Sequence, residues 1–524
     1  MLDYLIRGGN LVDGTGEEPR QAHVGMSGDR IAYVGNRELP ASEVIDVSGM
    51  IVSPGFIDTH GHSEFTLLAD GRAEAKVSQG VTSEINGNCG LSAAPLSGEA
   101  LSHREATLAE LGIRERWSTF TEYFDILASK GIALNFATLC GHGNLRACVV
   151  GYGERAPSDG ELARMKALFI EALGAGVRGL STGLIYPPGM YATTEELVEI
   201  ASVMSDAGGT RGVYASHMRD EGDGLLESVG EVLRIGRESG VAAHISHIKT
   251  SGERNWGKID EVVAQVERAR GTGQPVTCDR YPYVASSTDL DAVLPSWVFD
   301  GGVDSEVGRL SDPSTRKRLA AELASKEDHE WTKVWVSTVT KDDHKWMEGL
   351  SVSEIAGRMR KSPVEAVLDL LRDERTRVGA IFFSMNEENL RRFLGLPYAM
   401  VGSDSSVRGF SGPTVMGKPH PRAFGTFARF IGLYVRERGT VSLTEAVRRI
   451  TSLPAATFSL EKRGVIREGY YADLTVFDYG KIGDCATFSD PYCRARGVSH
   501  VFVNGVPVVH GGEFTGLRPG RVLR

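Results

Sequence analysis

Residues 55–62 read GFIDTHGH, a short apolar run followed by two histidines one residue apart. In an extended strand, residues i and i+2 point to the same side, so His60 and His62 can face one cation. Imidazole nitrogens bind Zn²⁺ and other transition metals well. Two exposed turn histidines would give the same pattern, so the motif needs support from the rest of the chain.

Short apolar strands that end in small or polar residues recur along the chain, with amphipathic helices between them. GELARMKALFIEALGAG at 160–176 and LLESVGEVLRIGRESG at 225–240 are two such helices. This alternation is typical of an α/β fold with a parallel sheet, and eight strand ends predict a (β/α)8 barrel of the TIM type. The strand ends lie at 59–62, 86–89, 139–142, 181–183, 216–217, 246–247, 279–281 and 402–404.

One place in this barrel has two candidate strands. The segment 276–283 and the segment 379–385 are both strand-like, and the pattern leaves open which of them completes the barrel. A third strand-like segment, VWVSTV at 334–339, lies in a polar stretch. That stretch predicts a small insertion at about 300–350.

Both ends of the chain look alike, because each is rich in short β-strands separated by turn residues. VNG at 503–505, near the C-terminus, is a hairpin signal. We therefore expect residues 1–55 and 465–524 to form one small β-sandwich domain together, which leaves 56–464 for the catalytic barrel.

Composition narrows the class of protein. The 524 residues carry a net charge of −10, which argues against a nucleic-acid partner, because such binding needs concentrated positive charge. The six cysteines are scattered and predict a reducing compartment. The first residues lack the apolar core of a signal peptide, and no run of 18 apolar residues appears, so we expect a cytoplasmic protein without a membrane partner.

The strand ends carry six side chains that can bind a metal ion, and barrel enzymes place their active sites at these ends. Each alone could be a packed histidine, a buried apolar cysteine or a costly buried carboxylate. Together, one thiolate and four imidazoles favour Zn²⁺ over Mg²⁺ or Ca²⁺. Two sites that share the cysteine, or one tight site with a weaker neighbour, both fit this set of His60, His62, Cys89, His217, His247 and Asp404.

These motifs resemble the amidohydrolase superfamily: GFIDTHGH, NCG at 88–90, the SH pairs at 216–217 and 246–247, and GSD at 402–404. More narrowly, the chain is similar to the D-aminoacylases nearly end to end, including STGLIYPPGMYA at 181–192, DRYPYVASST at 279–288 and GKPHPRAFGTF at 417–427. Many superfamily members bridge two metals with a carboxylated lysine, whereas this family uses a cysteine. Cys89 occupies that position here.

The resemblance implies zinc-dependent hydrolysis of N-acyl-D-amino acids in a metal-dependent hydrolase barrel. It assigns the tight zinc to Cys89, His217 and His247, and a weaker second position to the other three candidates. Zinc would lower the pKa of its water and polarise the scissile carbonyl. Asp404 would take a proton from that water as general base and return it to the leaving amine as general acid.

An amino-acid deacylase must also hold a free carboxylate, which needs Arg or Lys assisted by hydroxyls. By resemblance, the candidates are Lys249, Tyr281, Ser287 and Arg422, with Tyr186 as a further pocket residue.

The segment 284–302 bears on the side chain of the substrate. It contains no Arg or Lys, which disfavours an acidic side chain. Its apolar residues Leu290, Val293, Leu294 and Trp297 favour a neutral or hydrophobic one. Asp289 and Asp291 leave a cationic side chain open.

Other functions remain open on the sequence alone. The same superfamily contains L-Xaa-D-Xaa dipeptidases and cyclic-amide hydrolases, and a barrel of this kind could also serve as a non-catalytic scaffold. The preference for D over L substrates rests on resemblance only. Oligomeric state, acyl-chain preference and the number of zinc ions are not determined by the sequence.

Overall fold

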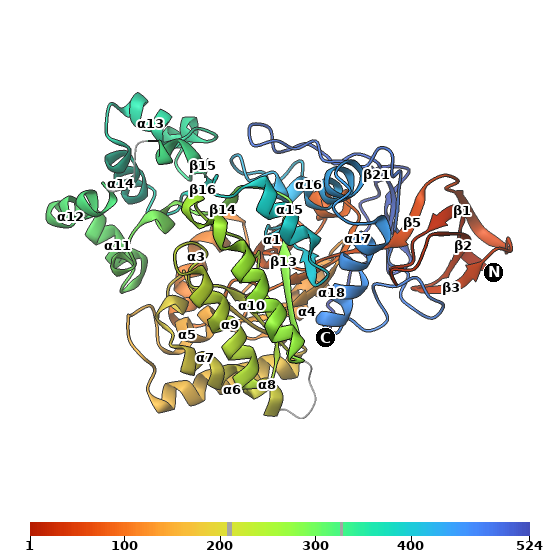
Figure 1. The fold of residues 1–524 in the computed structure, drawn as a ribbon, viewed down its shortest axis with the longest axis horizontal. Coiled ribbons are helices and arrows are strands. Elements are labelled where there is room, and N and C mark those ends of the chain that lie inside the picture. The colour runs from red at the N-terminus through yellow and green to blue at the C-terminus, as the bar shows by residue number, and fades with distance from the viewer. Residues whose placement is uncertain (207–211, 325–328) are drawn as a thin grey trace.

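Parallel strands form a closed barrel at the centre of the computed structural model, which describes residues 1–206, 212–324 and 329–524 (Figure 1). Neighbouring barrel strands pair in parallel, in the order in which they occur along the chain, except that β8 and β9 do not pair with each other. The strands are β6 (Phe56–Asp58), β7 (Val81–Asn86), β8 (Asn135–Thr138), β9 (Cys140–Gly141), β10 (Gly179–Gly183), β11 (Val213–His217), β12 (Ala242–Ile245), β13 (Val276–Arg280) and β17 (Ala399–Val401). Because β8 and β9 are separated only by Leu139, they share one position, and the expected eight-position barrel is confirmed.

The barrel closes between its last strand and its first. The amide of Asp404, just after β17, donates to the carbonyl of His60 at 2.8 Å. Gly61 and Ser405 form a parallel bridge at the same place. The ends of β17 and β6 therefore lie side by side, which brings Asp404 next to the two histidines of the GFIDTHGH stretch.

Packed side chains fill the barrel interior below these strand ends. Ile57, Ile85, Ala137, Ala215 and Met400 come from five different strands and contact one another in one buried cluster. Such filling is usual in TIM barrels, where the interior is a core rather than a pore. A site of this fold is therefore confined to the carboxyl ends of the strands.

Amphipathic helices cover the barrel, as the sequence pattern indicates. Helix α9 (Leu225–Ser239) buries Leu225, Val229, Val232 and Gly236 on one face. Gly236 allows close packing, since a Cβ atom there would lie 2.9 Å from the Cβ of Ala243 in β12. Helix α6 (Asp159–Ala175) begins at a capping box in which Ser158 and Glu161 bond each other's backbone.

Both chain ends join one nine-stranded sheet, so the expected β domain is confirmed (Figure 1, red and blue). Side chains from both segments share its core, among them Val24, Val52 and Phe502. Asn504 and Gly505 form the predicted turn with positive φ values of 50° and 78°. The strands are β1 (Leu2–Leu11), β2 (Arg20–Ser27), β3 (Arg30–Gly35), β4 (Ala41–Asp46), β5 (Ile51–Pro54), β18 (Leu474–Phe477), β19 (Val498–Val503), β20 (Val506–His510) and β21 (Glu513–Phe514).

A third unit lies between β13 and β17 and projects from the barrel (Figure 1, green to teal). Its antiparallel sheet has the order β14 (Ser286–Asp289), β16 (Gly379–Phe382), β15 (Val334–Thr338). Thus β13, in the segment 276–283, completes the barrel, whereas the segment 379–385 contributes its strand to this unit. The sheet and its helices extend beyond the stretch of about 300–350 where the sequence places an insertion. The helices are α11 (Gly302–Ser311), α12 (Pro313–Leu323), α13 (Val352–Met359) and α14 (Pro363–Asp373).

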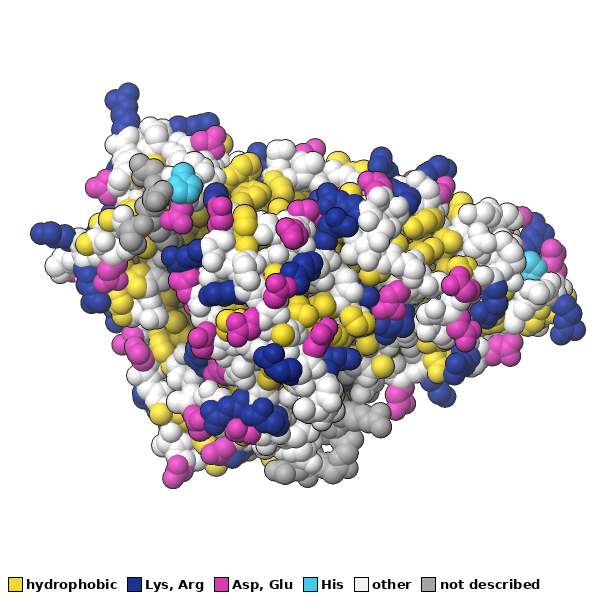
Figure 2. Space-filling model, in the orientation of Figure 1, with side chains coloured by type: hydrophobic (Ala, Val, Ile, Leu, Met, Phe, Trp, Pro, Cys, Tyr) yellow, Lys and Arg dark blue, Asp and Glu magenta, His cyan; other side chains and the backbone are white. Residues whose placement is uncertain are grey.

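The surface carries both signs of charge. On the face shown in Figure 2, Lys and Arg side chains are interspersed with Asp and Glu. Among the described residues, no helix combines the length and the apolar character that crossing a bilayer requires.

Candidate metal centre

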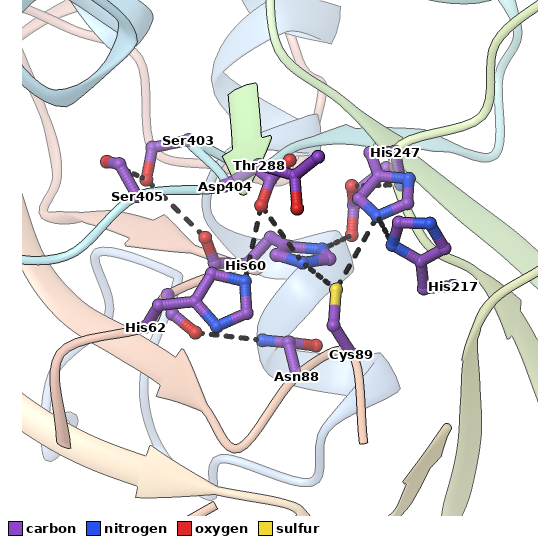
Figure 3. A network of polar contacts seen from close by, with 12 residues as sticks. His60, His62, Asn88, Cys89, His217, His247, Thr288, Ser403, Asp404 and Ser405 are labelled. Carbon is purple, nitrogen blue, oxygen red and sulfur yellow. Dashed lines mark hydrogen bonds and ion pairs between the residues drawn. The ribbon is translucent and has the colours of Figure 1, made fainter. Parts of the chain in front are cut away.

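Six side chains from the strand ends converge on one place above the barrel core (Figure 3). Their possible ligand atoms form two overlapping groups, in each of which all atoms lie within 4.8 Å of one another. Cys89 belongs to both groups. The first group is Cys89, His217 and His247, and the second is His60, His62, Cys89 and Asp404.

The first group has the donors and spacing of a zinc site. Cys89 Sγ lies 3.5 Å from His247 Nε2, and that nitrogen lies 2.8 Å from His217 Nδ1. Ligands of a tetrahedral zinc, bound at about 2.0 Å for nitrogen and about 2.3 Å for sulfur, lie roughly 3.3–3.6 Å apart. The sulfur–nitrogen distance matches this range, and the nitrogen–nitrogen distance is about 0.5 Å shorter. The three residues can therefore hold one ion and leave a position for another ligand.

The second group lies on the other side of the same sulfur. His60 Nε2 is 3.3 Å from Cys89 Sγ and 3.6 Å from Asp404 Oδ1, and His62 Nε2 is 3.2 Å from the same carboxylate oxygen. Asp404 therefore lies beside His60 and His62, because the barrel closes between the end of β17 and the end of β6. A second ion here would share the Cys89 thiolate with the first.

Three of the six residues have left-handed backbone conformations. Cys89, His247 and Asp404 have φ values of 53°, 37° and 51°. This region is uncommon for residues other than glycine and is often found at functional sites. The neighbouring Gly183 has no room for a side chain, because its Cβ would lie 2.1 Å from the carbonyl oxygen of Cys89. These strained backbone conformations turn the side chains of Cys89, His247 and Asp404 toward one another.

The candidates for carboxylate binding surround the cluster. Arg422 Nη1 lies 2.9 Å from Asp404 Oδ2, and its Nη2 donates to the carbonyl of Ser287 at 3.0 Å. The guanidinium also lies 4.7 Å from the ring centre of Tyr281. Tyr186 stacks edge-on with His217 at 5.0 Å and bonds Thr288 at 2.9 Å. Arg422 therefore contacts the second metal-binding group and Tyr186 the first.

Comparison with known proteins agrees with this geometry. A family model described as the amidohydrolase family matches residues 43–509. The chain belongs to the amidohydrolase family. This amidohydrolase is 39% identical to a D-aminoacylase of Alcaligenes xylosoxydans xylosoxydans, with 100% of this chain and 97% of that protein covered. An N-acyl-D-aspartate deacylase of the same organism is 36% identical, with 99% and 95% covered.

A solved structure gives the same result for the fold. The N-acyl-D-glutamate deacylase of Bordetella bronchiseptica, crystallised with zinc and a phosphonate inhibitor, superimposes with a TM-score of 0.84 at 35% identity. The match covers 100% of this chain and 99% of that one. The amidohydrolase therefore groups with the D-aminoacylases in sequence and in structure, as the resemblance implies.

The cluster favours the ionised forms of two candidate ligands of this amidohydrolase. Burial raises the pKa of the Cys89 thiol, but His60, His217 and His247 together hold it well below its usual range. Burial also raises the pKa of Asp404, and the charge of Arg422, with His60, lowers it well below its usual range. A thiolate and a carboxylate are the forms that bind metal ions.

Asp279 was not identified from the sequence, although it contacts two of the candidate ligands, His60 and His247. Its Oδ2 lies 3.0 Å from His60 Nδ1 and 2.8 Å from His244 Nε2, and its Oδ1 accepts the amide of His247 at 2.8 Å. A carboxylate behind a metal-binding histidine fixes the tautomer and the ring orientation. The sequence feature that could have identified Asp279 is its position near the end of β13, directly before the RYPY motif.

Glu221 was also missed, and it changes the reading of Lys249. The Lys249 ammonium forms an ion pair with Glu221 and lies 2.8 Å from His247 Nδ1. Burial raises the pKa of Glu221, but the charge of Lys249, followed by His217 and His247, lowers it below its usual range. Lys249 thus lies behind His247 and is already paired with Glu221.

The apolar residues expected around the substrate side chain pack elsewhere. Leu290, Val293 and Leu294 are buried in the core of the projecting unit, together with Trp331 and Val336. The Trp297 indole lies against Arg318 and donates to Glu322. The structure therefore assigns these side chains to the packing and surface of the third unit.

Proposed function

We propose that this amidohydrolase cleaves the amide bond of N-acyl-D-amino acids with the help of zinc, and releases a carboxylate and a free D-amino acid. One observation carries the proposal. It is that Cys89 belongs to both metal-binding groups, with the Arg422 cation 2.9 Å from Asp404 of the second group, and it supports a role for Arg422 at the substrate's carboxylate. The D configuration of the substrate is proposed because the relatives are named D-aminoacylase and N-acyl-D-aspartate deacylase.

The tight zinc belongs to Cys89, His217 and His247 in this proposal. A weaker second position belongs to His60, His62 and Asp404. Zinc lowers the pKa of a water towards about 7 and polarises a carbonyl oxygen. The buried protein groups around it exclude bulk water and keep the donor atoms in place.

Asp404 is proposed as the residue that moves the proton. Its Oδ1 faces His60 and His62, and its Oδ2 faces Arg422. Ionised, the carboxylate accepts a proton from the attacking water; protonated, it donates that proton to the nitrogen of the leaving amine. An amide nitrogen cannot leave as an anion, so this second transfer is required.

The substrate's carboxylate is proposed to bind at Arg422, assisted by Tyr281 and Ser287. The Tyr281 hydroxyl is buried and has no hydrogen-bond partner among the described residues, so it can donate to a ligand. Lys249 has three N–H donors, of which Glu221 uses one, and is proposed to contribute another. Tyr186 is proposed to line the pocket from the side of His217.

The side chain of the substrate is proposed to be neutral or hydrophobic. Residues 284–302 offer no Arg or Lys to pair with an acidic side chain. A pocket that buries an anionic group without such a partner pays a large desolvation penalty. D-methionine, D-leucine and D-phenylalanine derivatives should therefore be better substrates than D-glutamate derivatives.

The test is a panel of paired substrates with zinc measured on the same sample. N-acetyl-D- and N-acetyl-L-methionine, leucine, phenylalanine, glutamate and lysine, with L-Leu-D-Phe as a dipeptide, would be compared by kcat/KM. We expect zinc in the purified protein and turnover of the D-acetyl compounds with apolar side chains. Preference for the L series, turnover of the dipeptide alone, or full activity in a zinc-free preparation would overturn the proposal.

A further inference from the structure

Glu221 lies behind two of the proposed zinc ligands at once. It follows β11 by four residues, and its side chain is 13% exposed. Its Oε1 lies 3.0 Å from His247 Nδ1, and its Oε2 lies 3.8 Å from His217 Nε2. Each of these nitrogens is on the side of its ring away from the cluster, because His247 Nε2 and His217 Nδ1 face each other at 2.8 Å.

The tautomer of His247 follows from this geometry. A histidine that binds a metal through Nε2 uses the lone pair of that nitrogen, so a neutral ring carries its proton on Nδ1. That N–H needs an acceptor. Lys249, at 2.8 Å, has only donors, whereas the carboxylate of Glu221 accepts.

The opposite tautomer is required at His217. This ring faces the cluster through Nδ1, so a neutral metal-bound His217 carries its proton on Nε2. Nε2 is buried and has no hydrogen-bond partner among the described residues. The Oε2 atom of Glu221 lies 3.8 Å from it, just outside hydrogen-bond distance, and has the lone pairs that this N–H needs.

We propose that Glu221 is a positioning residue shared by both histidines, with one oxygen accepting from His247 Nδ1 and the other from His217 Nε2. The Lys249 ammonium compensates the negative charge of Glu221 at this buried position. The inference rests on the proposed function, since it concerns the zinc held by Cys89, His217 and His247. It adds that a single carboxylate sets the tautomers of two ligands, so its loss weakens both ligands together.

The variant Glu221→Gln tests this arrangement. The amide oxygen can accept one N–H, but the amide nitrogen meets the second N–H as another donor, so Gln cannot serve both rings. Zinc affinity would be measured by competition with a chromophoric chelator at fixed pH. Loss of a carboxylate behind a ligand typically weakens metal binding about 10–100-fold, and we expect a decrease in that range. Glu221→Asp, which keeps two acceptor oxygens, should recover part of the affinity.

Glu196→Gln is the matched control. Glu196 is also buried, and it also bonds a histidine and a cation, namely His142 at 2.9 Å and Arg146 at 2.6 Å. His142 lies outside both metal-binding groups. Zinc affinity of this variant should stay within about twofold of wild type, because a carboxylate behind a histidine changes metal binding only when that histidine is a ligand.

The outcomes separate the two proposals. If the wild-type protein binds zinc and deacylates its substrates, but folded Glu221→Gln keeps wild-type zinc affinity, the inference is wrong and the proposed function stands. If the wild-type protein binds no zinc, both are wrong. Should Glu221→Gln fail to fold, Glu221→Ala decides: unchanged zinc affinity without any carboxylate at this position would contradict the shared contact.

Discussion

Arg422 Nη1 lies 2.9 Å from Asp404 Oδ2, so the cation proposed for the substrate's carboxylate contacts the carboxylate proposed to move the proton. The contact therefore links the proposed binding of the substrate's carboxylate to the proposed proton transfer. His420 supports it, since its Nδ1 accepts the backbone amide of Arg422 at 3.0 Å. A change at Arg422 should therefore affect both KM and kcat.

Arg422→Met is predicted to reduce kcat/KM for N-acetyl-D-methionine by roughly 30-fold or more, because losing one partner of a buried charge pair costs about 2–5 kcal/mol. KM should rise, since the substrate's carboxylate loses its main partner, and kcat should fall, since Asp404 loses its neighbour. Steady-state kinetics on zinc-loaded protein measures both. A variant with unchanged KM would exclude Arg422 from substrate binding.

Asp404→Asn is predicted to keep the tight zinc but lose turnover. The amide cannot accept the proton, and general acid–base catalysis typically contributes about 10²–10⁴-fold, so kcat should fall by that factor. Zinc content by atomic absorption and kcat on the same sample decide the matter. Retention of most of the wild-type kcat would rule out this role for Asp404.

Lys76→Met is predicted to destabilise the fold. The Lys76 ammonium is fully buried and bonds Asp58 at 2.6 Å and Glu84 at 2.8 Å, beneath the strand ends that carry the ligands. Removing it leaves two buried carboxylates uncompensated, which should lower the free energy of unfolding by about 3–5 kcal/mol in urea titrations. The control Lys166→Met breaks a partly exposed pair with Glu199 and should change it by under about 1 kcal/mol. A similar small effect for Lys76→Met would contradict the network.

Glu306→Gln is predicted to change how stability depends on pH. Burial, together with the charge of Asp289, raises the pKa of Glu306 to about 8 in the folded protein. The folded state therefore binds more protons than the unfolded state between the ordinary glutamate pKa of about 4.3 and about 8, so this group makes stability fall as pH rises through that window.

The glutamine variant lacks this loss. Its melting temperature, relative to wild type in the same buffer, should be higher at pH 8.5 than at pH 5. Thermal unfolding of both proteins at the two pH values measures the difference. An equal offset at both would show that Glu306 ionises normally in the folded state.

The sequence predicted the convergence of the six candidate side chains better than their surroundings, and the reason is geometric. The spacing of two predicted His60 and His62 on one side of a strand; β6 ends at Asp58, so both histidines lie just after it, and both still face Asp404. The parallel barrel brings Cys89, His217 and Asp404 to the same end. These relations depend only on secondary structure and strand order. The choice between β13 and the segment 379–385 depended on pairing partners, which the apolar pattern alone does not contain.

The contacts behind the ligands needed tertiary structure. Glu221 lies close to two histidines from different strands, and Asp279 of β13 contacts His244 of β12 and His60, which follows β6, so neither role follows from spacing. The apolar residues of 284–302 were interpreted as a pocket, although Leu290 and its neighbours fill a separate core. An apolar run predicts burial, but it does not predict what buries it.

The central claim is that Cys89, with His217 and His247, holds the zinc of this amidohydrolase. X-ray absorption at the zinc edge on protein loaded with one equivalent of zinc tests it most directly. We predict one sulfur at about 2.3 Å and two imidazole nitrogens at about 2.0 Å, with the sulfur lost in Cys89→Ala. A first shell of nitrogen and oxygen only in the wild-type protein would contradict the account.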